Sequence, residues 1–262
     1  MPRRIIIHGG FHKTGTSTVQ STLRDNRVAM KTQIALRLRW HLKDLIAAAH
    51  AYSNARDANA LEAVQAQFDT LMTDLPGMPR RTLILSAPEL AGHMPGRPGL
   101  MDYAAAPELF YVYWELAKKH YPAADIQFFL TTRAPEAWLA SVYAQHLAAS
   151  DLTLEYSAYA AQYAASADLA GMVTEIASRV PAPVHHAALE ACADLPLGPA
   201  GPLLDLCKLP DAMRKGLHPA APPPPAEDPA LLHALLDANR TYADPKARQA
   251  AKEALRRTAG TP

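Results

Sequence analysis

Cysteine is scarce in this sequence, and its scarcity excludes a cysteine-based metal or redox motif. Only Cys192 and Cys207 occur among 262 residues, and neither has the spacing of metal ligands or of a redox pair. The two could form one disulfide, but two buried thiols in a reduced, cytoplasmic protein are the expected state. No cluster of carboxylates, histidines or cysteines suggests a bound metal, so we expect none.

An excess of either charge and a long hydrophobic run are also missing. The chain has 26 basic and 25 acidic residues, a formal net charge of +1. This balance creates no field that favours nucleic acid or an anionic membrane, so we expect neither as a partner, and any anion site must be local. No stretch reaches the roughly 18 apolar residues of a membrane helix. The apolar run at 5–7 is too short for a secretory signal, which again indicates a cytoplasmic protein.

What is present is an alternation of short apolar runs with longer helical segments. Buried parallel strands are expected at 4–8, 82–86 and 126–132, with a weaker candidate at 184–187. Helices are expected at about 16–27, 34–52, 59–75, 108–121, 135–149, 230–239 and 245–257. Strands alternating with helices predict a doubly wound α/β fold, in which a mostly parallel central sheet carries helices on both faces.

The C-terminal part differs in composition. Residues 219–229 include four consecutive prolines and are expected to form an extended, semi-rigid spacer. The chain therefore divides into an α/β domain at 1–218, a proline-rich spacer at 219–229 and a helical segment at 230–262.

The most informative segment joins the first expected strand to the first helix. Residues 8–18 read His-Gly-Gly-Phe-His-Lys-Thr-Gly-Thr-Ser-Thr. Unpaired backbone N–H groups and the helix dipole make a helix start attractive to anions, and glycines let a phosphate approach the backbone closely. Lys13 adds a full charge, and four hydroxyl side chains follow it. An ordinary helix cap in a glycine-rich turn is the structural alternative, but a cap needs neither the lysine nor so many hydroxyls.

This loop is not a Walker A motif, because Lys13 precedes Gly15 and Thr16 stands where the Walker lysine would be. The order Lys-Thr-Gly-Thr-Ser resembles the 5′-phosphosulfate loop of the PAPS-dependent sulfotransferases, a family with a P-loop NTPase-like fold. The resemblance implies that Lys13 contacts the bridging region from which the sulfuryl group leaves. The residues that it implies for binding PAPS in this segment are His12, Lys13, Thr14, Gly15, Thr16, Ser17 and Thr18.

A second anchor follows the third expected strand. Arg133 lies at the strand end, where open α/β sheets usually bind ligands, and Ser141 lies about two turns into the next helix. The spacing of Arg133, Pro135, Ser141 and Tyr143 is similar to the 3′-phosphate site of the same family, which implies that Arg133 and Ser141 hold the 3′-phosphate of PAPS. Taken alone, a structural arginine and a small helix-packing serine would explain the same residues.

A third basic segment, at 213–216, is similar to the arginine-lysine-glycine stretch that touches the 3′-phosphate in cytosolic sulfotransferases. The resemblance implies that Arg214 and Lys215 also bind PAPS, although a solvated basic turn explains them equally well.

The general base is expected after the second strand. Glu89 and His93 both follow residues 82–86, and either side chain could accept the acceptor's proton. Bacterial and heparan-type sulfotransferases carry a strand that ends in serine and then glutamate, and this segment is similar to it. Here Ala87 and Pro88 lengthen the gap between Ser86 and Glu89. Glu89 is the first choice and His93 the second. A carboxylate in the first turn of a helix is favoured by the helix dipole in any case, which is the structural alternative for Glu89.

These residues together imply an enzyme that transfers a sulfuryl group from PAPS to a hydroxyl or amine of a small-molecule or carbohydrate acceptor, without a metal. One alternative is a P-loop nucleotide kinase or NTPase with an altered loop, which would need magnesium and a carboxylate at the carboxyl edge of the sheet. Asp125 begins its strand and so lies at the opposite edge. A catalytically inactive sulfotransferase-like binding module is the other alternative.

Overall fold

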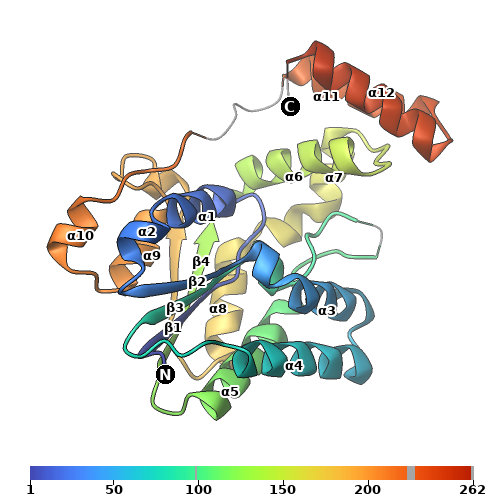
Figure 1. Cartoon of the computed structure of the whole chain (residues 1–262). Coiled ribbons are helices and arrows are strands. Elements are labelled where there is room, and N and C mark those ends of the chain that lie inside the picture. The colour runs from blue at the N-terminus through green and yellow to red at the C-terminus, as the bar shows by residue number, and fades with distance from the viewer. Residues whose placement is uncertain (98, 223–227, 261–262) are drawn as a thin grey trace.

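The computed structural model describes residues 1–97, 99–222 and 228–260, and its centre is a five-stranded parallel sheet (Figure 1). The strand order is β2-β3-β1-β4-β5, and every pairing is parallel. The strands are β1 (Arg4–His8), β2 (Ile34–Leu38), β3 (Thr82–Ser86), β4 (Asp125–Thr132) and β5 (Val184–Ala188). The three central strands are apolar and buried on both faces, as parallel strands covered by helices must be.

Helices cover both faces of the sheet, which confirms the predicted doubly wound α/β fold (Figure 1). The smaller hydrophobic cluster, around Ile6, is covered by α1 (Thr16–Asp25), α2 (Arg27–Met30), α9 (Ala200–Leu206) and α10 (Asp211–Lys215). The larger cluster, around Ile7, is covered by α3 (Lys43–Ala55), α4 (Ala58–Thr73), α5 (Ala106–His120), α6 (Pro135–Ala149), α7 (Tyr156–Tyr163) and α8 (Leu169–Arg179).

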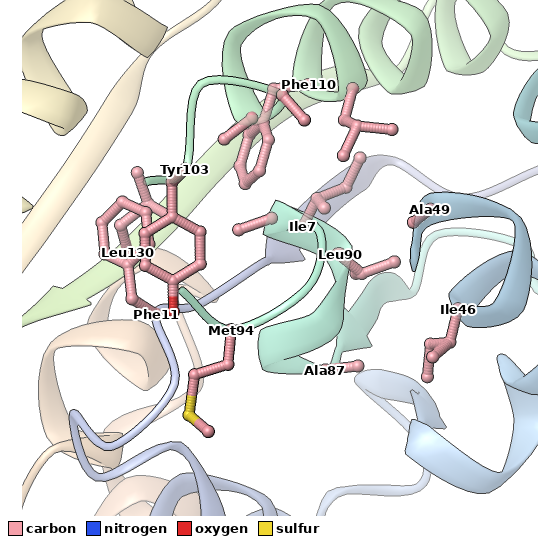
Figure 2. Packing of buried hydrophobic residues seen from close by; sticks show 14 of the residues in the cluster. Ile7, Phe11, Ile46, Ala49, Ala87, Leu90, Met94, Tyr103, Phe110 and Leu130 are labelled. Carbon is pink, nitrogen blue, oxygen red and sulfur yellow. The ribbon is translucent and has the colours of Figure 1, made fainter. Parts of the chain in front are cut away.

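In the described part of the chain, four short 3₁₀ segments connect these elements. They are η1 (Arg39–His41), η2 (Pro88–Ala91), η3 (Ala164–Ala167) and η4 (Glu190–Cys192). Figure 2 shows Leu90 of η2 between Ile7 of β1 and the α3 residues Ile46 and Ala49. The segment after β3 is therefore held in the larger core.

The helix expected at 34–52 is wrong in its first part, because residues 34–38 form the edge strand β2. Ile34 and Leu38 lie in the smaller cluster, whereas Ala35 lies in the larger one on the opposite face. This is the period-two alternation of a strand, and β2 pairs with β3 in register from Ile34 opposite Thr82. Burial on both faces and backbone pairing outweigh the local preference of alanine, leucine and arginine for a helix. The helix α3 begins only at Lys43.

The C-terminal segment forms α11 (Pro229–Thr241) and α12 (Pro245–Thr258), as expected. Leu235 lies in the larger core, and Asn239 Nδ2 donates to the carbonyl oxygens of Leu147 and Leu152. The predicted spacer lies partly outside the described residues, at 223–227. Cys192 and Cys207 are free and buried, as expected. No helix in the described part of the chain is both long and apolar enough to cross a membrane.

The strand order reverses beside β1. The chain runs from β1 to β2 and β3 on one side, and then to β4 and β5 on the other. In open α/β sheets, ligands bind outside the carboxyl ends of the strands at such a switch point. The loop at 9–15 leaves β1 at this edge, so the fold places the loop where a ligand is expected.

Candidate functional site

The loop after β1 is fastened to the end of β4. Phe11 N donates to the carbonyl oxygen of Thr131 over 3.1 Å, and Thr131 N donates to that of Gly10 over 2.7 Å. The hydroxyl of Thr14 is buried and lies 2.6 Å from both the carbonyl oxygen of Phe11 and Thr131 Oγ1. The Thr14 hydroxyl therefore ties the loop together, and only the backbone of this residue remains to meet a ligand.

His12 is fixed through its main chain. Its N–H donates to the hydroxyl of Tyr103 over 3.2 Å, and its carbonyl oxygen accepts from Trp138 Nε1 over 2.9 Å. His12 Nδ1 lies 2.9 Å from the same tyrosine oxygen. Burial, together with the charges of nearby histidines and arginines, lowers the pKa of His12 to about 3. The imidazole is therefore neutral at pH 7 and adds no charge to the loop, and its part in binding PAPS stays a prediction.

The start of α1 presents the donors that an anion requires. Gly15 is the N-cap with a left-handed φ of 88°, and no side chain caps the first turn. The helical hydrogen bonds begin at Val19 N, which donates to the carbonyl oxygen of Gly15, so the N–H groups of residues 16–18 have no acceptor within the helix. A Cβ at Gly15 would also lie 2.7 Å from Leu189 Cδ1. The dipole of α1 reinforces these donors, as at other anion-binding helix starts.

Lys13 and Arg133, from the two sequence motifs, are in direct contact. Arg133 Nη1 donates to the carbonyl oxygen of Lys13 over 3.1 Å, across a separation of 120 residues. Lys13 has a left-handed backbone, with φ of 62°, and its Nζ donates to Gln145 Oε1 over 3.4 Å. Gln145 lies one turn beyond Ser141 on α6, so both project from one side of that helix. The structure thus brings Lys13, Arg133 and the Ser141 side of α6 to one end of the sheet.

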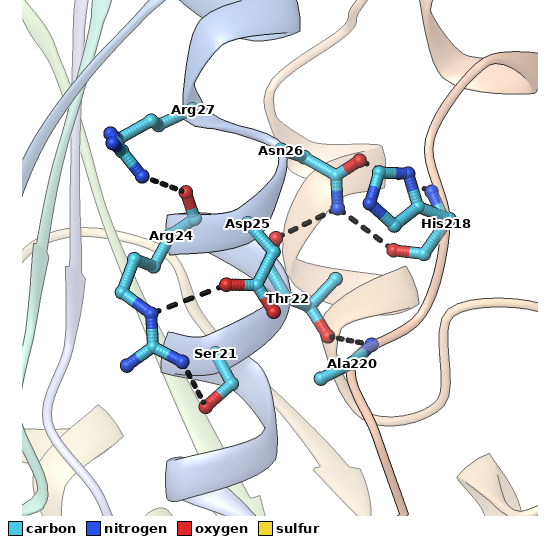
Figure 3. A network of polar contacts seen from close by, with 8 residues as sticks. All are labelled: Ser21, Thr22, Arg24, Asp25, Asn26, Arg27, His218 and Ala220. Carbon is cyan, nitrogen blue, oxygen red and sulfur yellow. Dashed lines mark hydrogen bonds and ion pairs between the residues drawn. The ribbon is translucent and has the colours of Figure 1, made fainter.

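Arg214 is engaged elsewhere. Its guanidinium pairs with Asp205 at 2.8 Å and donates to the carbonyl oxygen of Gly201 over 3.2 Å. Arg214 and the exposed Lys215 line an open cavity of about 420 Å³ beside α9. After α10 the chain returns to α1, where Asn26 Nδ2 donates to the carbonyl oxygen of His218 over 2.8 Å (Figure 3). No hydrogen bond or ion pair within the described ranges joins Arg214 to the loop, so its role in PAPS binding stays a prediction.

Glu89 is a buried carboxylate with one paired oxygen. It lies in η2, which begins at Pro88 and packs against α3. Arg39 Nε donates to Glu89 Oε1 over 2.5 Å. The other oxygen, Oε2, is buried and has no hydrogen-bond partner among the described residues. Glu89 lies in the first turn of η2, as the structural alternative also expects, and in addition it pairs with Arg39, the residue that follows β2.

His93 has the wrong tautomer for a base. Its Nδ1 accepts from Met94 N over 3.0 Å, and because a backbone N–H can only donate, the proton of the neutral ring lies on Nε2. Burial, together with the charges of His50 and Arg97, lowers the pKa of His93 to about 4. At neutral pH His93 Nε2 is therefore a hydrogen-bond donor, and Glu89 is the better candidate for the base.

Several residues of this region were not expected from the sequence: Arg39, His50, Arg97, Tyr103 and Gln145. Arg39 has a local signal, because it ends the alternating run of β2 at the carboxyl edge of the sheet. The others have none, since they come from helices or from the loop before α5. His50 stacks on His93 with ring centroids 4.2 Å apart.

Comparison with known proteins identifies no relative. No protein-family model matches the chain, and no curated protein matches it. Within the described ranges, no group of three or more histidine, cysteine, aspartate or glutamate residues is placed to hold a metal ion. The functional argument therefore depends on the fold and on the geometry at the carboxyl edge of the sheet.

Proposed function

We propose that this chain is a PAPS-dependent sulfotransferase of the cytoplasm, which transfers a sulfuryl group to a hydroxyl or amine of a small-molecule or carbohydrate acceptor. The observation that carries the proposal is the hydrogen bond between Arg133 Nη1 and the carbonyl oxygen of Lys13. It joins the two segments that resemble the 5′ and 3′ anchors of the family. They meet beside β1, where the strand order reverses and a nucleotide is expected.

The donor would span the end of the sheet from α1 to α6. The free N–H groups of residues 16–18 and the ammonium of Lys13 would hold the 5′-phosphosulfate. A guanidinium carries five N–H donors, so the bond to the loop leaves Arg133 further donors for the 3′-phosphate, to which Ser141 adds a hydroxyl. The same hydrogen bond fixes the distance between the two anchors, which favours a ligand with phosphates at both ends.

The reaction would be a direct displacement at sulfur. Glu89 accepts the proton of the acceptor hydroxyl, the acceptor oxygen forms a bond to sulfur, and the bond from sulfur to the bridging oxygen of the 5′-phosphate breaks. The electron pair of that bond stays on the leaving phosphate, where Lys13 and the N–H groups of α1 offset the growing charge. The sulfuryl group carries less charge than a γ-phosphoryl group, so these groups can stabilise its transfer without magnesium.

Calorimetric titration tests the donor site. We expect PAP, the desulfated product, to bind without magnesium and at least tenfold more tightly than ADP or ATP. Arg133→Ala should weaken PAP binding at least tenfold. Arg27→Ala is a matched control, because Arg27 Nη1 donates to the carbonyl oxygen of Arg24 in the same manner but on exposed α2.

Each alternative has its own signature in this titration. A preference for ATP with magnesium would assign the chain to the nucleotide kinases or NTPases. Asp125 would not serve such an enzyme, because it pairs with Arg4 at the amino edge of the sheet. Absence of any nucleotide binding would indicate a binding module without catalysis.

A further inference from the structure

The segment between η2 and α5 holds Arg97 in a fixed position. Gly96 N donates to the carbonyl oxygen of Leu100 over 3.1 Å, and His146 Nε2 lies 2.9 Å from the carbonyl oxygen of Pro95. Gly96 has a φ of 101°, and a Cβ there would lie 2.2 Å from the hydroxyl of Tyr159. Only glycine fits this close contact with α6 and α7. The turn that carries Arg97 is therefore packed against the body of the protein.

Arg97 has no carboxylate partner in the part of the chain that the structure describes. Its side chain is half-buried, and its Nε is buried without an acceptor. The charge of Arg97 contributes to lowering the pKa of four histidines, which places it among them. A guanidinium N–H withdrawn from water without an acceptor is costly, so the arrangement favours a ligand that supplies one.

The imidazoles beside Arg97 have further unused polar atoms. His50 Nε2 is buried without a partner among the described residues, and His50 stacks on His93. The tautomer of His93 leaves its Nε2–H as a donor. Glu89 is the nearby acidic group, and Arg39 already pairs with its Oε1. Arg97 and Arg39 act on His50, and His50, Arg97, His146 and Glu89 act on His93. Arg97 therefore supplies the positive charge of the cluster, and Arg97 Nε–H and His93 Nε2–H are its hydrogen-bond donors.

We propose that Arg97, His50 and His93 bind an anionic group, a carboxylate or a sulfate ester, carried by the acceptor. This inference rests on the proposed function, because Glu89, the proposed base, is a neighbour of the same cluster. The donor anchors lie instead in the loop between β1 and α1, at the start of α1, just after β4 and on α6. An acceptor held here by its negative charge would have its hydroxyl within the neighbourhood of Glu89.

An open groove beside this cluster indicates that the acceptor also has a ring. Arg39, Trp40, Lys43 and Ile46 line a cavity of about 310 Å³. Trp40 is 49% exposed, so its ring offers a flat surface for a sugar or aromatic ring. Arg39 belongs to both the groove and the ion pair with Glu89, so the groove leads to the proposed base. The acceptor class is therefore an acidic, ring-bearing molecule.

The test compares two probes that differ in one carboxylate: 4-nitrophenyl β-D-glucuronide and 4-nitrophenyl β-D-glucoside. Proton–nitrogen NMR of the imidazoles of the full chain reports binding without requiring turnover. We expect the glucuronide to bind at least tenfold more tightly than the glucoside, and to raise the pKa of His50 and His93, because an anion favours the protonated ring. Equal binding of the two probes, or no change at these two rings, would overturn the inference.

Arg97→Gln should abolish the preference for the glucuronide, whereas Arg27→Gln on exposed α2 should retain it. The NMR titration of the unaltered chain with the two probes decides the outcome even where Arg97→Gln does not fold.

The affinity for PAP distinguishes this site from the donor site. Arg97→Gln should change the PAP affinity by less than twofold, and a larger loss of PAP affinity would assign Arg97 to the donor site instead. If the glucuronide preference is found but PAP does not bind, the anion site stands and the proposed function fails. If PAP binds without that preference, the donor site stands and the acceptor class proposed here is wrong.

Discussion

Arg39 and Glu89 form an ion pair between an exposed and a buried side chain. Arg39 Nε donates to Glu89 Oε1 over 2.5 Å, and the two side chains are 65% and 8% exposed. The pair joins the end of β2 to η2 beyond β3. Glu89 is therefore positioned by a contact from the residue that follows the edge strand of the sheet. Because Arg39 is exposed, an acceptor can approach the pair from solvent, which a fully buried carboxylate would not permit.

Substitution of the two base candidates should have unequal effects. We expect Glu89→Gln to lower the turnover of PAPS to PAP by about 10²- to 10⁴-fold, the usual contribution of a general base. His93→Gln, which retains a side-chain amide donor, should lower turnover less than about tenfold. Stopped assays of PAP formation with an acidic acceptor measure both. PAP affinity is the control and should stay within twofold in each variant. A larger loss of turnover in His93→Gln than in Glu89→Gln would make His93 the base.

The hydroxyls of the loop should separate into structural and ligand-binding groups. Thr14→Val removes the hydroxyl that lies 2.6 Å from the carbonyl oxygen of Phe11 and from Thr131 Oγ1, and should lower the free energy of unfolding by about 1–3 kcal/mol. Ser17 is exposed, so Ser17→Ala should leave stability within about 0.5 kcal/mol and weaken PAP binding. Urea unfolding and calorimetry measure the two quantities. Equal stability of both variants would show that Thr14 does not hold the loop.

Stability should fall in acid because of a buried histidine. Burial lowers the pKa of His8 to about 3 from its usual value of 6.5, and its Nδ1 lies 2.8 Å from Ser86 Oγ. Between these values the unfolded chain binds a proton that the folded chain does not. The contribution of His8 is therefore present above pH 6.5, and it is lost as the pH falls from 6.5 towards 3, by up to about 1.4 kcal/mol per pH unit.

The variant His8→Asn tests this pH dependence. It should flatten the slope of the free energy of unfolding between pH 6 and pH 4, measured by urea unfolding in one buffer series. Exposed His233 on α11 supplies the control, since its ring stays in water in both states. An unchanged slope in His8→Asn would mean that other groups cause the acid sensitivity.

Most of the sheet and the loop could be predicted because their signals are local. Residues 4–8 are β-branched and followed by two glycines, and both features act within a few residues. Residues 34–38 could not be predicted in the same way, because Ile-Ala-Leu-Arg-Leu also suits a helix, and only pairing with β3 makes it a strand. His50 and Arg97 come close to Arg39 through tertiary packing alone. Arg39 directly follows β2, but the spacing of the three residues in the sequence fits no motif.

The last prediction concerns the backbone of Lys13. Its φ of 62° is left-handed, which costs a residue with a Cβ about 1 kcal/mol but costs glycine little. The free energy of unfolding of Lys13→Gly should therefore be about 1 kcal/mol higher than that of Lys13→Ala, although both variants lack the ammonium group. Both variants should lose PAPS turnover, since neither can offset the charge of the leaving phosphate. A stable but inactive Lys13→Gly would show that the left-handed backbone at residue 13 is kept because it positions the lysine side chain. Strained backbone of this kind persists where function requires it. Equal stability of the two variants would show that the loop relaxes, and that the left-handed backbone is not what positions the ammonium.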